Sequence, residues 1–563
     1  MQGWLCSGYV FRVTPTAEGE ALFNLALAIT EAGRSRPDHP AVITGEIRLS
    51  FSQLDKAVTD LARGLRASGL QPGDTVALHL PAGVDFVVSF YAVLRAGLVA
   101  APFSPQASRR EIRHVLELSG ARAVVAEESA RESVIAACNP RRTTLVVADS
   151  PLSGGTRASC DHTLEGDQHL SALMRLGRRV SHETMVSRSA DDVAAIIFTS
   201  GTTGAPKGAE LTHANLWVSC TALLSRSEPD ADDVVLACLP LHHVFGMSGL
   251  MNAAMAWGMT LVLTSRFDAA ETLDLIERYG VTRFSGVPAM FCDMLAAGTG
   301  GRDLSSLSHV TSGGSALPTG IVDAFEEMVP SATLLEGYGA TETTSSICVN
   351  SDCRRRRSGT VGTPSWGTEL RVVDEEGRVL PDGSGQTGEL QVHGPTVFRG
   401  YIGDPEATRQ AFDGGWLRTG DLAHIDADGY VYLVDRKKNM IIRGGLNVYP
   451  AEIEQVLATM HGVSDVVVLG YPDDRLGEEV AALVIAEPER SSHGDATDDG
   501  ELIARLDERL RTELAPYKRP RLIELVDQLP RSAAGKIIRP DAQRLLAERL
   551  ASTARRPSTG RGS

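Results

Sequence analysis

Hydrophobic and polar residues follow a helix–strand alternation through the first half of the chain. The segment TVALHL at 75–80 predicts a buried strand, and VDFVVSFYAVLRAG at 84–97 predicts a buried helix. Strands that alternate with helices of this length are typical of βαβ units and of parallel sheets covered on both faces. The pattern predicts an α/β protein that starts with two doubly wound βα subdomains, at residues 21–190 and 191–335.

The pattern changes in the second half. Short alternating segments separated by turn sequences such as DEEG, PDGSG and DADG predict an antiparallel, distorted β-barrel at residues 336–435. Beyond it, Pro450 begins a helix, and two strands and a second helix follow, which predicts a small α+β domain at 436–545. Residues 1–20 are expected to form an N-terminal extension, and residues 546–563 a disordered tail.

Composition and charge narrow the functional classes. The chain has 563 residues, with 55 Lys and Arg against 71 Asp and Glu, and a formal net charge of −16. Such an acidic chain lacks the broad positive field that drives binding to nucleic acid or to an anionic membrane surface, so we expect no nucleic-acid partner. Eight cysteines without a C-x-x-C pair suit a reducing compartment, and no export signal is visible, so the cytoplasm is the expected location.

The longest uncharged run, at residues 244–265, is long enough to suggest a transmembrane helix. However, it contains Gly246, Gly249, Asn252 and Gly258 and ends in the strand-like segment MTLVLT. We therefore expect a buried helix, a turn and a strand here, and no transmembrane segment.

The strongest local signal is the segment TSGTTGAPKG, from Thr199 to Gly208, which follows an apolar strand and precedes a helix. Such a loop offers backbone N–H groups, hydroxyl groups and one lysine to a polyphosphate. It is not a Walker A sequence, because Pro206 stands where that motif has a glycine before its lysine. The alternative is a flexible surface loop rich in Gly, Ser and Thr.

Three motifs in order resemble those of the adenylate-forming superfamily: FTSGTTGAPKG, then YGATE at 338–342, then GWLRTGD at 415–421. That superfamily includes acyl-CoA and aryl-CoA synthetases, nonribosomal adenylation domains and firefly luciferase. The resemblance extends from about Leu22 to Arg539. It implies that ATP activates a carboxylic acid as acyl-AMP with release of pyrophosphate, that Mg²⁺ assists, and that coenzyme A then takes the acyl group.

The resemblance also assigns roles to individual residues. The loop from Thr199 to Lys207 is expected to hold the β- and γ-phosphates, Thr341 to contact phosphate, and Glu342 to bind Mg²⁺. Asp421 matches the residue that accepts hydrogen bonds from the ribose, and Arg436 matches a second ribose or phosphate contact. The segments 313–316 and 336–338 resemble those that enclose adenine and the reacting carboxylate. The residues expected against the nucleotide are Thr199, Ser200, Gly201, Thr202, Thr203, Gly204, Lys207, Gly314, Ser315, Ala316, Glu336, Gly337, Tyr338, Gly339, Asp421 and Arg436.

Activating a carboxylate with ATP brings two anions together, so the site needs a cation at the reacting atoms. Lys536, in LPRSAAGKIIR, resembles the family's catalytic lysine, which is expected to bridge carboxylate and α-phosphate oxygens. A lone lysine near a C-terminus is more often a surface residue, but this one stands in the family's order and setting. Pro540 departs from the more usual basic residue and puts the following helix in doubt.

By resemblance, the small domain is mobile and rotates on a hinge at Lys438, so that adenylation and thioester formation use opposite faces of that domain. Gly444 and Gly445 are expected beside the channel for the pantetheine arm of coenzyme A, where glycine allows close approach. Ile442 replaces the lysine that coumarate ligases and luciferases carry, which argues against those branches.

His243 matches a family histidine that lies against the acyl pocket and is a candidate catalytic residue. The pair His242 and His243 has no third ligand at a convincing spacing, so we expect no metal there. The expected pocket segments, 242–252, 286–290 and 313–316, contain no Asp that could pair with an α-ammonium group, which disfavours an amino-acid substrate.

Gly246, Gly249 and Gly313 are expected to leave volume in the acyl pocket. A medium- or long-chain fatty acid–CoA ligase is therefore the first hypothesis and an aryl acid–CoA ligase the second. Residues 341–389 lack the extra segment by which fatty acyl-AMP ligases restrain domain rotation, which favours coenzyme A over a carrier protein as the thiol. A non-catalytic nucleotide-binding regulatory protein is the alternative from another class. A homodimer is compatible with the sequence.

Overall fold

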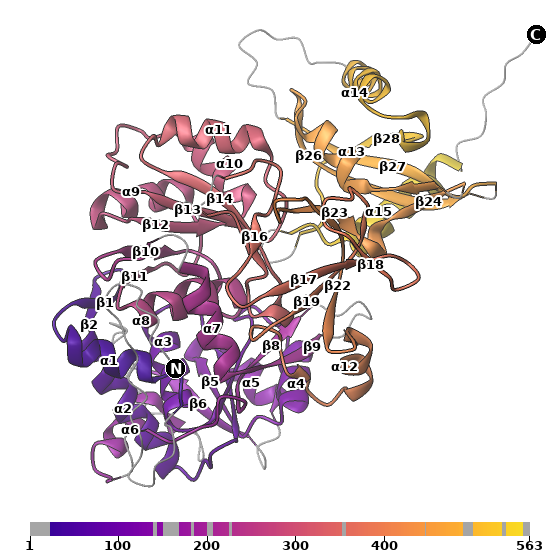
Figure 1. Ribbon diagram of the computed structural model, residues 1–563. Coiled ribbons are helices and arrows are strands. Elements are labelled where there is room, and N and C mark those ends of the chain that lie inside the picture. The colour runs from indigo at the N-terminus through magenta and orange to yellow at the C-terminus, as the bar shows by residue number, and fades with distance from the viewer. Residues whose placement is uncertain are drawn as a thin grey trace, which may run out of the picture.

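The computed structural model describes residues 23–138, 143–149, 168–181, 185–199, 206–224, 228–351, 356–444, 446–473, 475–487, 499–531 and 536–554. Within these ranges the chain forms a large N-terminal domain, built on two mostly parallel sheets and one antiparallel sheet, and a smaller α+β domain (Figure 1). The predicted fold class is confirmed. The expected extension at residues 1–20 lies outside the described residues.

The first parallel sheet contains the predicted phosphate loop at its edge. Its strand order is β20 (Gly400–Tyr401), β9 (Lys207–Thr212), β8 (Val193–Thr199), β4 (Val99–Pro102), β3 (Thr75–His79), β5 (Ala123–Glu127), β6 (Thr144–Ala148) and β7 (Gln168–His169). Its helices include α2 (Phe51–Ala67), α3 (Val84–Arg95), α4 (Arg109–Ser119), α5 (Arg131–Ala137) and α6 (Leu170–Gly177). Strand β3 and helix α3 confirm the predictions at 75–80 and 84–97.

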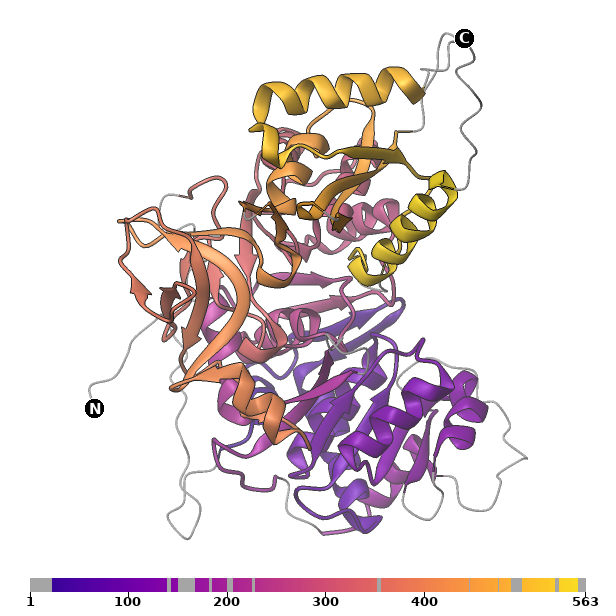
Figure 2. The same cartoon turned by 90° about the vertical axis from the view of Figure 1, so that its right-hand side faces the viewer.

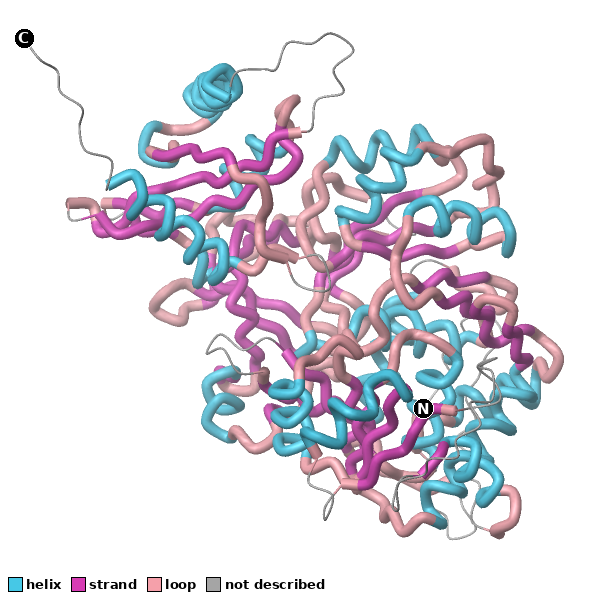
Figure 3. Tube along the Cα trace, turned by 180° about the vertical axis from the view of Figure 1, so that it is seen from behind, coloured by secondary structure: helices cyan, strands magenta, loops and turns pink. Residues whose placement is uncertain are grey.

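The second parallel sheet presents the ends of several strands to the site. Its order is β16 (Thr363–Pro364), β15 (Cys348–Val349), β14 (Thr333–Tyr338), β13 (His309–Gly313), β12 (Arg283–Gly286), β10 (Val234–Ala237), β11 (Thr260–Leu263), β1 (Pro40–Thr44) and β2 (Ile47–Ser50). Helices that accompany the sheets include α1 (Leu27–Ser35), α7 (His213–Leu224), α9 (Ala269–Tyr279), α10 (Pro288–Ala297) and α11 (Thr319–Met328). Helices flank the strands of both parallel sheets (Figure 3).

The division between the two sheets differs from the predicted boundary after residue 190. Strands β8 and β9 join the first sheet, although they follow that boundary, and β1 joins the second sheet by pairing Val42 with Leu261. The periodicity of a segment predicts a strand but not its neighbours, because pairing is decided by packing across distant parts of the chain. The phosphate loop therefore belongs to the first subdomain.

The antiparallel sheet confirms the change of pattern in the second half. It consists of β17 (Glu369–Val373), β18 (Val379–Leu380), β19 (Gly388–His393), β21 (Phe412–Asp413), β22 (Trp416–Ile425) and β23 (Val431–Arg436), and α12 (Pro405–Ala411) lies between β20 and β21 in the chain. The sheet starts at Glu369 rather than near 336, because β14 and β15 extend the second parallel sheet. The DADG sequence forms the predicted hairpin turn between β22 and β23.

The small domain is a mostly antiparallel sheet with helices on both faces. Its elements are β24 (Ile441–Arg443), β25 (Leu446–Val448), α13 (Pro450–Ala458), β26 (Val463–Asp473), β27 (Gly477–Ala486), α14 (Asp499–Glu513), β28 (Leu522–Leu525) and α15 (Arg539–Ala554). Figure 2 shows α14 and α15 on opposite sides of this sheet. The residues of β26 and β27 alternate between the two apolar layers, with Val466 and Val468 on the α14 side and Val467 and Leu469 on the α15 side.

Helix α15 corrects the expectation of a disordered tail from residue 546. The helix continues through Ala554, and Leu546 is fully buried against β26 and β27. Pro540 does not prevent it, because proline is tolerated in the first turn of a helix, where its missing N–H has no intrahelical partner. The apolar residues of this segment form a helical face that the polar composition of the tail concealed.

The uncharged run at 244–265 forms a π-helix (Phe245–Asn252), helix α8 (Ala253–Trp257) and strand β11, as expected. Residues 246–252 of the π-helix are buried. Among the described helices, none combines the length and the apolar character that crossing a membrane requires. Single π-helical turns are frequent at functional sites, and this one faces the predicted acyl pocket.

Candidate active site

Lys536 extends from the small domain to the large domain and meets Gly314. A Cβ atom placed on Gly314 would lie 3.2 Å from Cε and 3.5 Å from Nζ of Lys536. Gly314 has a φ of +89°, in the left-handed region that favours glycine. The predicted catalytic lysine and the glycine segment expected to enclose the reacting carboxylate are therefore side by side, although they are 222 positions apart in the sequence.

The ammonium group of Lys536 lies in an environment that disfavours its charge. Although the residue as a whole is exposed, desolvation of its charged end lowers the pKa, Arg436 lowers it further, and Asp421 acts in the opposite direction. Burial also lowers the pKa of His243, and the charge of Lys536 contributes. His243 is consequently neutral near pH 7, and it lies within electrostatic reach of the lysine.

His242 and His243 have ring centroids 4.6 Å apart. Burial and the two neighbouring histidines, His243 and His79, lower the pKa of His242 to about 3. In the described part of the chain, no group of three or more His, Cys, Asp or Glu side chains is arranged to bind a metal ion by itself.

Asp421 is held by groups from two sheets. The residue is 7% exposed, and its carboxylate accepts a hydrogen bond from the Tyr338 hydroxyl and lies 3.1 Å from Nε of Arg436. Arg436 is its register partner across β22 and β23. Burial raises the pKa of Asp421, whereas Arg436, the Tyr338 hydroxyl and Lys438 lower it. The result is an oriented carboxylate that can accept hydrogen bonds from hydroxyl groups of a ligand.

Glu336 lies next to the segment 313–316. It accepts a hydrogen bond from the N–H of Leu317 at 3.4 Å, and its strand pairs with β13, where Gly337 is the partner of Gly313. Burial raises the pKa of Glu336 to about 7, against opposing contributions from Leu317 and Arg356. The predicted adenine segments, 313–316 and 336–339, are thus adjacent. The carboxyl group of Glu336, which begins the second segment, titrates near neutral pH.

Glu342 follows β14 in a short 3-10 helix, Thr341–Thr343. Its carboxylate oxygen Oε1 accepts a hydrogen bond of 2.7 Å from the hydroxyl of Tyr401. The ring of Tyr401 lies under Lys207, whose Nζ is 5.0 Å from the ring centroid. The candidate Mg²⁺ ligand, the phosphate contact Thr341 and the lysine of the predicted phosphate loop are therefore close to one another.

The phosphate loop connects two strands that pair with each other. Thr199 and Lys207 are register partners of β8 and β9. Ser200, Gly201, Thr202, Thr203 and Gly204 lie outside the described residues, so their predicted contacts stay predictions.

The acyl pocket differs from expectation, because the three glycines do not leave empty volume. A Cβ on Gly249 would lie 3.0 Å from the ring of Phe245, and one on Gly313 would lie 3.1 Å from the same ring. A Cβ on Gly246 would lie 2.4 Å from the carbonyl oxygen of Pro240. Glycine permits close packing as readily as it leaves a void. At these three positions a side chain would meet the Phe245 ring or backbone atoms, so the missing side chains leave no free space there.

The predicted hinge and channel residues lie at the start of the small domain, and Lys438 is close enough to Asp421 to lower its pKa. Lys438 is in the short turn Lys437–Asn439, between the last strand of the antiparallel sheet and β24. Gly444 has a φ of +59° and donates its N–H to Leu476 at 2.8 Å, beside exposed Ile442. Figure 1 shows β24 on the side of the small domain away from the parallel sheets. Gly445 lies outside the described residues.

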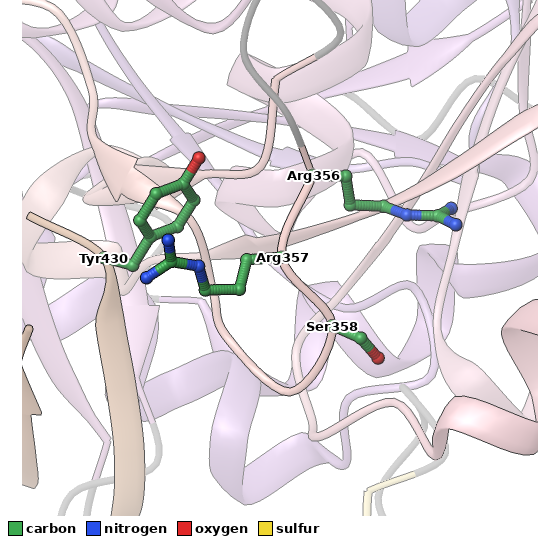
Figure 4. A pocket seen from close by; sticks show the side chains of 4 residues that line it. All are labelled: Arg356, Arg357, Ser358 and Tyr430. Atoms are coloured by element: carbon green, nitrogen blue, oxygen red, sulfur yellow. The ribbon is translucent and has the colours of Figure 1, made fainter. Parts of the chain in front are cut away.

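A separate cavity of about 320 Å³ is lined by Arg356, Arg357, Ser358 and Tyr430 (Figure 4). Its arginines are already paired: Arg356 with Glu326, and Arg357 with Asp426 and Asp428. The carboxylates around this cavity outnumber its two guanidinium groups. It therefore lacks the excess positive charge of an anion site, and none of the predicted site residues lines it.

One residue next to the site, Tyr401, was missed by the sequence analysis, and Phe245 was included only as a member of the expected pocket segment 242–252. Tyr401 stands in RGYIGD and Phe245 in HHVFGM, where a single aromatic residue has no distinguishing pattern. Only the pairing of its strand with β9 indicates that Tyr401 lies next to the site, and pairing between distant strands is not visible in one sequence.

Comparison with known proteins gives the family. The model described as AMP-binding enzyme matches residues 29–402, and the model described as AMP-binding enzyme C-terminal domain matches residues 452–536. The chain belongs to the AMP-binding enzyme family. It is an AMP-forming acid–thiol ligase of the adenylate-forming superfamily, which confirms the resemblance of its motifs and sets aside the non-catalytic alternative.

Two curated relatives with different substrates are similarly related to the chain. A feruloyl-CoA synthase from Amycolatopsis sp is 34% identical over 514 residues, covering 91% of this chain and 96% of the relative. A long-chain-fatty-acid–CoA ligase from Bacillus subtilis (strain 168) is 32% identical over 543 residues, covering 92% and 93%. This chain therefore has acyl- or aryl-CoA ligase activity. The two relatives do not decide between an acyl and an aryl acid as its substrate.

Two solved structures of one protein agree with the fold. The ATP-bound crystal structure of MatB from Rhodopseudomonas palustris matches with a TM-score of 0.81, 30% identity and coverage of 93% of this chain and 99% of that chain. The apo structure of the same protein matches with a TM-score of 0.73, at the same identity and with 93% and 98% coverage.

Proposed function

We propose that this AMP-binding enzyme activates an apolar carboxylic acid with ATP and passes the acyl group to coenzyme A. In the first step a carboxylate oxygen attacks the α-phosphorus, and pyrophosphate leaves with the electron pair of the broken P–O bond. In the second step the thiol sulfur attacks the acyl carbonyl, AMP leaves, and the thiol proton passes to solvent. The contact of Lys536 with Gly314 carries this proposal, because it brings a cation to the expected position of the carboxylate.

The proposed roles suit the surroundings of each residue. Lys536 bridges the carboxylate and α-phosphate oxygens, where a positioned cation in a desolvated site contributes about 3 kcal/mol of transition-state stabilisation. Asp421 accepts hydrogen bonds from the ribose hydroxyls, and Arg436 keeps its carboxylate oriented. His243 lies against the acyl group as a neutral ring, because burial lowers its pKa.

Mg²⁺ fits the site as a partner of the nucleotide. The donor set supports this, because Glu342 supplies one carboxylate and the described residues contain no cluster of three or more ligands. Mg²⁺ is commonly held by one or two carboxylates together with phosphate oxygens and water. Bound there, the ion would neutralise part of the phosphate charge, while Thr341 and Lys207 contact the phosphates.

The arrangement of the two domains is proposed to be that of the first step. Lys536 faces the large domain, and the match to the ATP-bound structure of MatB has a higher TM-score than the match to its apo structure. For the second step the small domain turns at Lys438 and presents Gly444 and the exposed β24–β25 hairpin to the pantetheine arm. The relatives named as a CoA synthase and a CoA ligase support coenzyme A rather than a carrier protein as the thiol.

For the acid, the packing of Phe245 favours a compact aryl acid over a long fatty chain. The ring closes the space beside Gly249 and Gly313, so that a long chain requires Phe245 to move. A medium- or long-chain fatty acid is the second candidate, supported by the buried Met247 and Met251 on the adjoining π-helix, because methionine adapts readily to a different packing.

Acid-dependent pyrophosphate release across a panel of aryl, fatty and amino acids, with and without coenzyme A, tests this proposal. We expect release with aryl acids at higher kcat/KM than with long-chain acids, little with amino acids, and a thioester product only when coenzyme A is present. Pyrophosphate release that does not depend on any carboxylic acid would refute it.

A further inference from the structure

Strand β20 lies directly beside the strand that leaves the phosphate loop. Tyr401 is the register partner of Ala209, and the N–H of Ile402 donates to the carbonyl oxygen of Gly208 at 2.8 Å. A Cβ on Gly208 would lie 2.7 Å from the Cγ2 methyl group of Ile402 and 2.9 Å from that of Ile196, so these two side chains pack over the glycine. The position of Tyr401 is therefore fixed relative to Lys207, the first residue of β9.

The same short segment holds Glu342. The N–H of Phe398 donates to the carbonyl oxygen of Glu342 at 2.9 Å, and the Tyr401 hydroxyl donates to its carboxylate oxygen Oε1 at 2.7 Å. The rings of Phe398 and Tyr401 pack edge to face, with centroids 4.9 Å apart. Both the backbone and the carboxylate of Glu342 are consequently tied to one strand that also pairs with the phosphate-loop hairpin.

We infer that Tyr401 is a positioning residue for the nucleotide, which orients the Glu342 carboxylate through its hydroxyl and supports Lys207 with its ring. This inference rests on the proposed function. One lone pair of the carboxylate accepts the tyrosine hydrogen, and the others stay available for a cation and its water. The ring face attracts the lysine ammonium electrostatically, which reduces the number of positions that this cation can adopt.

The surroundings of Tyr401 suit this role. The backbone N–H of Tyr401 donates to the hydroxyl of Thr408 at 2.8 Å, which anchors β20 to helix α12. A phenylalanine keeps the ring under Lys207 but loses the hydrogen bond, and a leucine loses both.

Calorimetric titration of the full chain with ATP, in EDTA and at increasing Mg²⁺ concentrations, separates these contributions. We expect Tyr401→Phe to leave ATP affinity in EDTA unchanged and to raise the Mg²⁺ concentration for half-maximal enhancement about tenfold, as expected for losing a hydrogen bond to a charged group. Tyr401→Leu should also weaken ATP binding in EDTA by about threefold, the scale of an exposed cation–π contact. Tyr279→Phe, which removes an exposed hydroxyl that bonds Gly45, serves as the control.

The double variant Tyr401→Phe with Glu342→Gln decides whether the hydroxyl acts through Glu342. If it does, Tyr401→Phe should have no further effect on Mg²⁺ dependence once Glu342 is changed. Equal Mg²⁺ dependence in the wild type and Tyr401→Phe would overturn the inference, as would full additivity in the double variant. A wild-type chain that binds ATP without any influence of Mg²⁺, or not at all, would instead count against the proposed function.

Discussion

At the residue scale, the proposed site brings exposed and buried charged groups together. Lys536, Arg436 and Asp421 influence one another, and burial shifts the pKa values of Lys536, Asp421 and Glu336 away from their ordinary ranges. Such shifts cluster at functional sites, because transition states are stabilised by charges that are already in position. In the proposed site, the ring of Phe245 limits the acyl space and the ring of Tyr401 limits the phosphate site.

Phe245 is expected to limit the length of the acid. We predict that Phe245→Ala raises kcat/KM for long-chain relative to aryl acids by roughly tenfold, the scale of a few methylene groups gaining a hydrophobic pocket. Gly249→Ala should lower activity towards all acids, because its methyl group would meet the Phe245 ring at 3.0 Å. Competition between an aryl and a fatty acid measures both effects, and an unchanged preference in Phe245→Ala would be inconsistent with the ring closing the pocket.

Glu336 predicts a pH dependence of stability. Its pKa is raised from 4.5 to about 7, so the folded chain binds this proton more tightly than the unfolded chain does. The resulting stabilisation is complete below pH 4.5 and is lost as the pH rises through about 7. We therefore expect the Tm of Glu336→Gln to increase relative to the wild type over this range. Thermal unfolding at a series of pH values measures it, and parallel curves for the two proteins would speak against the shift.

At the scale of elements, the outcome of sequence reasoning depended on whether the signal was local. The strand at 75–80, the helix at 84–97 and the hairpin at DADG were predicted because periodicity and turn residues act over a few positions. The strands that pair with β1 and β8 were not predicted, since strand pairing is decided by contacts across the whole chain. The same reason explains why Lys536 and Asp421 were found by motif, whereas Tyr401 was found only in the structure.

The short turn Lys437–Asn439 is the element on which the two half-reactions are predicted to depend. Lys438→Pro should retain acid-dependent pyrophosphate release and abolish thioester formation, because the proline ring removes rotation about φ. Lys438→Ala, which keeps that rotation, should support both steps. Separate assays of the half-reactions check this, and an unchanged overall rate in Lys438→Pro would exclude the turn as the hinge.

At the scale of the whole molecule, the proposed site is assembled from four sheets. The first parallel sheet provides the phosphate loop, the second provides Gly314, Glu336 and the segment leading to Glu342, the antiparallel sheet provides Asp421, and the small domain provides Lys536. A site divided in this way can be completed or dismantled by moving one domain. This division agrees with the proposal that the chain uses different faces of its small domain for two successive reactions.

The rate of adenylation in Lys536→Ala tests this arrangement most directly, measured as acid-dependent pyrophosphate release beside thioester formation from preformed acyl-AMP. We expect the first rate to fall by about a hundredfold or more, as for removal of a transition-state donor, and the second to be retained. Lys518→Ala, which removes a lysine paired with Glu452 inside the small domain, should change neither. Equal loss of both half-reactions in Lys536→Ala, or loss of neither, would contradict a site completed by this lysine.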